Sequence, residues 1–339
     1  MSTPAAQQPS PQLFFQTVNA HQRTEALKAA VELEVFTAIA EGNQSAADIA
    51  KRVSAAERGV RILCDNLCIM GFLTKSGDLY QLTPDSAFFL DKRSPAYIGG
   101  ATEFLLTPML TAGFQSLTEA VRKGGTAISE EGTVSADNPI WVKFARGMAA
   151  MMMMPSQQIA KLVDPQADKP LKVLDIAAGH GMFGIAFAMN NPNAEVVAVD
   201  WSNVLKVASE NAQKMGVGDR HRSIEGDAFE VDFGNDYDIV LLTNFLHHFD
   251  PPTNEKLLRK VHAALKPDGR AVTLEFVPND DRISPPETAG FSLVMLAGTK
   301  AGDAYTFAEL DKMLTNAGFK RSTIHLLPPG FQQVVVSEK

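Results

Sequence analysis

The sequence predicts an α/β protein in which a mainly helical N-terminal domain precedes a domain built on a mainly parallel sheet. Two observations predict this arrangement. Apolar residues in the first third of the chain recur at helical spacing, whereas from Leu171 onward short apolar strands alternate with helices. Such alternation is typical of a sheet with helices on both faces. A length of 339 residues with 45% hydrophobic residues is enough for two domains with sizeable cores.

In the first domain, the spacing predicts three helices and then a hairpin. The helices are expected over residues 26–40, 45–53 and 57–70, and the second begins at Ser45 in a capping-box-like pattern. Residues 71–83 are expected to form two short strands around a Lys-Ser-Gly-Asp turn. Three helices and a hairpin make a winged helix.

A winged helix has two interpretations, a DNA-binding element or a structural unit that forms a dimer. The third helix presents Arg58 and Arg61 beside Glu57 and Asp65, and the net charge of the chain is −8. A mixed face on an acidic protein is poorly suited to phosphate contacts. We therefore favour dimerisation, with no nucleic-acid partner.

The segments outside these elements predict a cytoplasmic protein with no membrane partner. Residues 1–12 are polar and proline-rich, which favours a disordered lead-in over a signal peptide. No apolar run is long enough to span a bilayer, and Cys64 and Cys68 are expected to be reduced residues on one helix face.

Between the two domains, the apolar stretch 98–121 is expected to be helical and to serve as a dimer contact or as a lid over a substrate pocket. The expected boundaries are therefore 13–123 for the winged-helix domain, 124–170 for a helical connector and pocket wall, and 171–339 for the sheet domain. In the connector, the methionine run 151–154 is equally compatible with an adaptable pocket wall and with a buried helix.

In the sheet domain, the apolar runs predict strands at 172–176, 195–200, 222–225, 237–243, 270–276 and 332–337. Helices are expected at 181–190, 203–215, 254–265 and 307–317. Ligands of such sheets bind at the carboxyl ends of the strands, where the strand order reverses.

A glycine-rich turn follows the first of these strands, and its ligand is open to two interpretations. Gly179-His-Gly-Met-Phe-Gly184 fits the dinucleotide pattern G-x-G-x-x-G, which alone is a weak signal. Asp175 lies in the strand before it, Asp200 ends the second strand, and Asp227 follows the third. A nicotinamide cofactor needs no third carboxylate, whereas a cationic sulfonium nucleoside suits all three. We therefore favour S-adenosylmethionine (SAM) over a nicotinamide dinucleotide.

With these motifs, nearly the whole chain resembles the class I SAM-dependent O-methyltransferases of the caffeate and acetylserotonin type, including their bacterial relatives. Leu174-Asp-Ile-Ala-Ala-Gly-His-Gly181 is similar to their motif L-D-V-G-G-G-x-G. Ala177 and Ala178 replace two glycines, which is tolerated if both keep a negative φ. The resemblance implies a winged-helix dimerisation domain, a Rossmann-like SAM-binding domain whose sheet ends in an antiparallel hairpin, and a homodimer.

The turn, the strand ends and the resemblance together predict the cofactor site. Its expected residues are Asp175, Ala177, Gly179, Gly181, Asp200, Trp201, Asp227, Ala228, Phe229, Thr243 and Phe249.

The resemblance also implies a general base within Asn244-Phe-Leu-His-His-Phe-Asp250. His247 matches the family's histidine, and His248 replaces an acid and is the second candidate. Of the two acids that orient the histidine in the family, one matches Glu275. The other falls in register on Ala304, so its neighbour Asp303 is the candidate.

The expected reaction is methyl transfer from SAM to a hydroxyl of a small, largely apolar acceptor, such as an aromatic secondary metabolite, without a metal. Candidate pocket walls are Phe144, Met148, Phe291 and Met295, although core packing explains each about as well. The alternatives are a C-, S- or N-methyltransferase, a SAM-sensing winged-helix regulator of DNA and, disfavoured by the three acids, a nicotinamide oxidoreductase.

Overall fold

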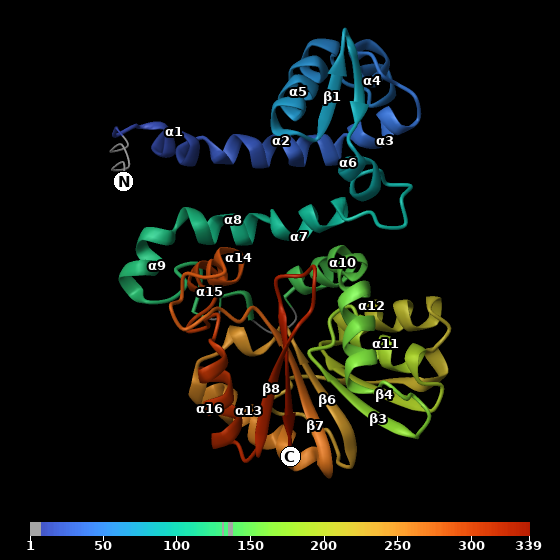
Figure 1. Ribbon diagram of the computed structural model, residues 1–339, viewed down its shortest axis with the longest axis vertical. Helices are drawn as coiled ribbons and strands as arrows, with labels where there is room; N and C mark the ends of the chain where they lie inside the picture. The colour runs from blue at the N-terminus through green and yellow to red at the C-terminus, as the bar shows by residue number, and fades with distance from the viewer. Residues whose placement is uncertain (1–7, 131, 135–137) are drawn as a thin grey trace, which may run out of the picture. The chain divides into compact units, whose positions relative to one another are not determined.

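The computed structural model describes residues 8–130, 132–134 and 138–339, and the chain forms two compact units, residues 1–102 and 103–339. Most of the predicted lead-in lies outside the described residues. Its last residue, Gln12, already belongs to the first helix. Figure 1 shows the helical N-terminal unit and the sheet of the second unit.

The N-terminal unit contains the predicted helices and hairpin. Its elements are α1 (Gln12–Val18), α2 (Ala20–Glu32), α3 (Val35–Ala40), α4 (Ala46–Arg52), α5 (Glu57–Met70), β1 (Leu73–Ser76), β2 (Leu79–Leu82) and α6 (Pro84–Phe89). The helix expected over 26–40 is interrupted, because Glu34 has a φ of 57° between α2 and α3. The predicted cap of α4 is present, since the Ser45 hydroxyl accepts the Asp48 N–H at 3.1 Å.

The first unit ends at residue 102, earlier than the expected boundary at 123. The stretch 98–121, expected to be helical, contains α7 (Thr102–Leu105) and α8 (Pro108–Gln115) and runs into α9 (Leu117–Lys123). Helices α8 and α9 pack on α15 (Phe291–Gly298) of the second unit. The approach is close, because a Cβ on Gly113 would lie 2.8 Å from the Ala297 carbonyl oxygen. This packing places residues 103–123 in the sheet unit.

The second unit is built on a seven-stranded sheet in the order β5-β4-β3-β6-β7-β9-β8. Its strands are β3 (Leu171–Ile176), β4 (Ala194–Asp200), β5 (His221–Glu225), β6 (Tyr237–Thr243), β7 (Leu265–Glu275), β8 (Arg321–Leu326) and β9 (Gln333–Glu338). All neighbours are parallel except β9, which runs antiparallel to both β7 and β8. The predicted mainly parallel sheet with a terminal antiparallel hairpin is therefore confirmed.

Two layers of helices cover this sheet, as Figure 1 shows. They are α10 (Ile140–Val163), α11 (Met182–Asn190) and α12 (Ser202–Lys214), and on the other side α13 (Pro251–Ala264) and α16 (Phe307–Asn316). Each face of the sheet has its own hydrophobic core, and successive strand residues point to opposite faces. Val173 packs with α10 and α11 in one core, whereas Leu174 packs with α13 and α16 in the other. Because both faces of the sheet are covered, its inner strands are continuous apolar runs, and these runs are the basis of the strand predictions.

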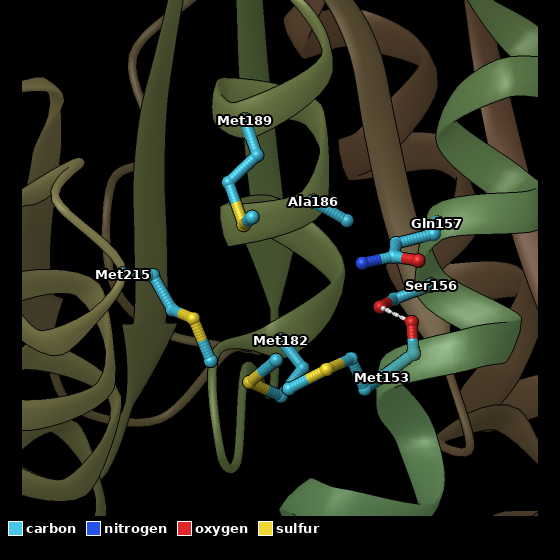
Figure 2. A pocket seen from close by; sticks show the side chains of 7 residues that line it. All are labelled: Met153, Ser156, Gln157, Met182, Ala186, Met189 and Met215. Atoms are coloured by element: carbon cyan, nitrogen blue, oxygen red, sulfur yellow. Dashed lines mark hydrogen bonds between the residues drawn. The ribbon is translucent and has the colours of Figure 1, made fainter.

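The methionine run on α10 divides between the two roles predicted for it. Met152 lines a large cavity, whereas Met153 packs toward Met182 of α11 and Met215 (Figure 2). The space between these side chains is only about 10 Å³. Met154 is half-exposed.

Within the described parts of the chain, we find no helix that is long and apolar enough to cross a membrane.

Candidate active site

A cavity of about 510 Å³ opens at the carboxyl ends of β3, β4 and β6, where ligands of parallel sheets bind. The predicted residues that line it are Ala177, Gly179, Asp200, Trp201, Asp227, Ala228, Phe229, Thr243, His247, His248, Phe249, Phe144, Met148, Phe291 and Met295. Predicted site residues that do not line it are Asp175, Gly181, Glu275 and Asp303. The sheet topology thus brings together segments that lie far apart in sequence.

The glycine-rich turn is fixed by backbone conformation and by Asp200. The Gly179 N–H donates to the Asp200 carboxylate at 2.8 Å. Gly179 and Gly181 have φ values of 57° and 73°, and a Cβ on Gly181 would lie 2.9 Å from the Ala208 Cβ. The expectation for Ala177 is wrong, because its φ is 53°, a conformation that costs an alanine about 1–2 kcal/mol.

Two carboxylates face the cavity from neighbouring strand ends. Asp200 accepts the N–H groups of Gly179 and Trp201, and burial raises the pKa of this carboxyl to about 6. Asp227 accepts the Phe229 N–H at 2.8 Å, which fixes the turn that carries Phe229 into the cavity. Ionised carboxylates only accept hydrogen bonds, so both are suited to ligands that bring hydroxyl or amino donors.

Asp175 has one of the two roles predicted for it, because it steadies the glycine-rich turn but does not face the ligand. It is fully buried and does not line the cavity, so it does not face a cationic ligand. One carboxylate oxygen accepts the Gly184 N–H of α11 at 2.9 Å, and burial raises the pKa of the group to about 7. Asp175 therefore ties the end of β3 to α11 and supports the turn from below.

The arrangement fits a sulfonium nucleoside. Asp200 and Asp227 offer acceptors to hydroxyl and amino groups, and Phe229 and Phe249, with ring centroids 5.0 Å apart, offer aromatic surface for a base. The negative charges of Asp200 and Asp227 also suit a cationic ligand.

Lys260 supports this site and was missed by the sequence reasoning. From α13 its ammonium donates to the carbonyls of Ala228 (3.0 Å) and Val231 (2.5 Å) and lies 4.0 Å from the centroid of the Phe233 ring. These contacts tie the turn that carries Asp227 and Phe229 to α13. No local motif indicates them, since Lys260 lies about thirty residues further along the chain.

We expect Lys260→Met to raise the KM for SAM about 5- to 20-fold with little change in kcat, because the turn loses two hydrogen bonds to a charged donor. Steady-state kinetics at varied SAM concentration measures the two constants separately. Arg259→Met, on the same helix but paired with Glu255 and Asn316 and not with this turn, is the matched control and should leave KM unchanged. A fall in kcat alone for Lys260→Met would contradict the role in cofactor binding.

On the opposite side of the cavity lies a buried pair, His247 and Glu275. His247 follows β6 and Glu275 ends β7, and His247 Nδ1 lies 2.5 Å from a Glu275 carboxylate oxygen. The other Glu275 oxygen accepts the backbone N–H groups of Phe245 (3.0 Å) and Leu246 (2.8 Å). Because a carboxylate only accepts, Nδ1 carries the hydrogen and Nε2 keeps its lone pair. The prediction that Glu275 orients His247 agrees with this geometry.

The prediction that Asp303 is the second acid that orients His247 is wrong. Its carboxylate is paired with Arg282 at 3.2 Å, and Arg282 also contacts Glu309. No hydrogen bond joins Asp303 to His247 in the part of the chain that the structure describes. His247 therefore has a single orienting acid, and Asp303 belongs to a surface ion-pair cluster.

Aromatic rings and methionines form the rest of the cavity wall. The four predicted wall residues are present, and Phe291 packs edge-on against His247 (4.9 Å) and stacks on Phe276 (4.0 Å). The wall residues that the sequence reasoning missed include Phe104, Leu105, Leu110, Phe114, Trp141, Asn244, Phe245, Phe276, Val294 and Gln332. Four of them, Phe104, Leu105, Leu110 and Phe114, belong to the 98–121 stretch, and this position agrees with the predicted pocket lid, while the alternative of a dimer contact stays a prediction.

Comparisons with known proteins give the family. Residues 114–320, more than half of the chain, match the model of the O-methyltransferase domain, and residues 15–92 match that of the O-methyltransferase dimerisation domain. The chain therefore belongs to the O-methyltransferase family, as its motifs predicted. It is an enzyme of the methyltransferase class whose methyl donor is SAM.

Individual relatives span nearly the whole chain. The 3-hydroxy-5-methyl-1-naphthoate 3-O-methyltransferase of Streptomyces sahachiroi is 28% identical over 94% of this chain and 92% of its own. A solved structure from Nostoc punctiforme PCC 73102, described only by class as an O-methyltransferase, is 58% identical with a TM-score of 0.95, covering 98% of this chain and all of the other. Human N-acetylserotonin methyltransferase in complex with SAM has a TM-score of 0.85 at 22% identity, covers 99% of both chains and shows the shared fold.

Proposed function

We propose that this protein transfers the methyl group of SAM to the hydroxyl of a small, neutral aromatic acceptor, with His247 as the general base. The observation that carries the proposal is the His247–Glu275 pair, in which His247 lines an aromatic cavity that Asp200 and Asp227 also line. Among the described lining residues, only Asp200 and Asp227 carry a full charge. The acceptor side therefore offers no cation to an anionic substrate.

Each residue has a defined task in this proposal. Bound SAM supplies an electrophilic methyl group on a sulfonium leaving group. Asp200 and Asp227 bind the nucleoside, and the aromatic wall excludes water and orients the acceptor ring. His247 Nε2 accepts the hydroxyl proton as the oxygen becomes nucleophilic, and Glu275 stabilises the imidazolium through Nδ1.

The test combines binding with turnover. We expect calorimetry to show micromolar binding of S-adenosylhomocysteine (SAH) and no binding of NAD. Incubation with methyl-labelled SAM and a panel of naphthols should give aryl methyl ethers. Label on carbon, nitrogen or sulfur of matched acceptors, with none on oxygen, would reject the proposed reaction.

The affinity for SAH should depend on the protonation of Asp200. Hydroxyl donors bind the ionised carboxylate, whereas burial favours its protonated form and raises its pKa to about 6. Binding below that pH requires loss of a proton, so the affinity should fall about tenfold per pH unit below pH ~6 and level off above pH ~7. Calorimetry with SAH across this pH range measures this fall in affinity. Asp200→Asn should remove the pH dependence of the affinity. A pH dependence that persists in the variant would be due to another group, such as Asp175.

We further propose a homodimer formed through the N-terminal unit, in a reducing cytoplasm. The match to the dimerisation domain supports the dimer, and so does helix α1, where Leu13, Phe14, Phe15 and Val18 are exposed. The location is supported by Cys64 and Cys68, which are both free thiols. Light scattering of the full chain, compared with a Phe14→Asp/Phe15→Asp variant, tests the dimer: the variant should be monomeric, and an unchanged mass would contradict this interface.

A further inference from the structure

The turn that carries His247, residues 245–249, is held at both of its ends by side chains from elsewhere in the fold. We call these residues the base turn. At its start, a Glu275 carboxylate oxygen accepts two backbone N–H groups. At its end, the Tyr305 hydroxyl donates to the Phe249 carbonyl at 2.5 Å. His247 therefore lies between an anchor that the proposed mechanism uses and one that it does not.

Tyr305 offers a hydroxyl that stays protonated. Only 5% of the residue is exposed, and its ring belongs to the same hydrophobic core as Leu246 of the base turn. Burial first, and then nearby carboxylates such as Asp303, raise the pKa of Tyr305 above its usual value. A protonated hydroxyl has a single hydrogen to donate, and this one is directed to the Phe249 carbonyl. The bond is therefore present throughout the pH range in which histidines titrate.

The segment before Tyr305 packs against the base turn through its backbone. Ala304, which stands in register with the second orienting acid of the family, is fully buried and has no polar side chain to offer an imidazole. Two residues earlier, a Cβ on Gly302 would clash with the His247 carbonyl oxygen. This part of the chain thus contacts the main chain of the base turn directly.

We propose that Tyr305 is a positioning residue that aligns His247 with the methyl donor by fixing the end of the base turn. Phe249, whose carbonyl accepts the bond, carries a ring that lines the cavity, with its centroid 5.0 Å from that of Phe229. His247 and Phe249 are only two residues apart, so a shift of this carbonyl moves the base relative to the cofactor side. A displacement of about 1 Å can cost about 100-fold in rate. This inference rests on the proposed function and adds a residue to it.

The experiment uses the full chain and the substitution Tyr305→Phe, which removes the hydroxyl and keeps the ring. The Phe249 carbonyl still accepts the Asn254 side-chain amide at 3.2 Å, so no buried acceptor is left unpaired. With 2-naphthol, we expect the single-turnover rate to fall about 5- to 50-fold, while the SAH affinity measured by calorimetry changes less than about twofold. The loss should disappear with nitro-substituted phenols, which are already ionised at neutral pH and need no base.

Tyr237→Phe is the matched control, since Tyr237 makes the same kind of bond away from the cavity. Its buried hydroxyl donates to the Phe233 carbonyl at 2.6 Å, and neither residue is among the described lining residues. This variant should lower the melting temperature to a similar degree but keep the rate with 2-naphthol and with acidic phenols. A role of Tyr305 in stability alone would make the two variants behave alike, and this result would overturn the proposal.

A second readout is the combination with His247→Ala. Because Tyr305 acts through the base, Tyr305→Phe should cause no further loss of rate in that background. The proposal is also overturned by an unchanged rate of Tyr305→Phe with 2-naphthol, by an equal loss for all phenols, or by a multiplied loss in the double variant. Full activity of His247→Ala with 2-naphthol would instead reject the proposed function, and this inference with it.

Discussion

Replacing His247 by alanine should lower kcat by about 10²- to 10⁴-fold, because the hydroxyl proton loses its acceptor at the moment the oxygen attacks. The affinity for SAH should stay the same, since the carboxylates proposed to bind the nucleoside, Asp200 and Asp227, come from β4 and the turn after β5. Single-turnover kinetics with labelled SAM and calorimetry with SAH measure these two quantities. His247 is buried within a short turn, so the melting temperature of the variant must also be compared.

A series of phenols distinguishes a lost base from a disturbed fold. Acidic phenols, such as nitro-substituted ones, are already ionised at neutral pH and need no base. The activity of His247→Ala should therefore recover toward that of the unaltered enzyme as the phenol becomes more acidic. An equal loss for all phenols would mean that His247 only supports the structure of the cavity.

The cofactor side of the site was largely predictable because its signals are local. Apolar runs located the ends of β3 and β4, and parallel strands expose their carboxyl ends at one edge of the sheet. Asp200 and Asp227 therefore had to lie together. Asp175 was misplaced by the same reasoning, because the face on which a strand residue lies depends on packing with α11, which the local pattern does not encode.

The remaining features depend on distant contacts or on backbone conformation. Lys260 reaches its turn from another helix, and Asp303 meets Arg282 across twenty-one residues. Strand β8 escaped prediction because Arg-Ser-Thr-Ile-His-Leu contains no apolar run, which is tolerated at the edge of a sheet. The positive φ of Ala177 is set by the turn in which it lies and contradicts the preference of alanine.

Glu275→Gln should reduce kcat by about 10²- to 10⁴-fold even though His247 is retained, because the substitution reverses one hydrogen bond. The carboxylate accepts from Nδ1 and leaves the Nε2 lone pair free. A glutamine amide in the same place can donate to Nδ1, which moves the imidazole hydrogen to Nε2, where it blocks proton acceptance. The glutamine oxygen can still accept the N–H groups of Phe245 and Leu246, so the turn should persist.

Two measurements separate this tautomer effect from simple destabilisation. Nitrogen NMR of the histidine rings should show the His247 hydrogen on Nδ1 in the unaltered protein and on Nε2 in Glu275→Gln. Because Glu275 acts only through His247, the double variant with His247→Ala should be no slower than His247→Ala alone. If the two losses in kcat multiply in the double variant, Glu275 also acts independently of His247. Full activity of Glu275→Gln would show that the orientation of His247 does not limit the reaction.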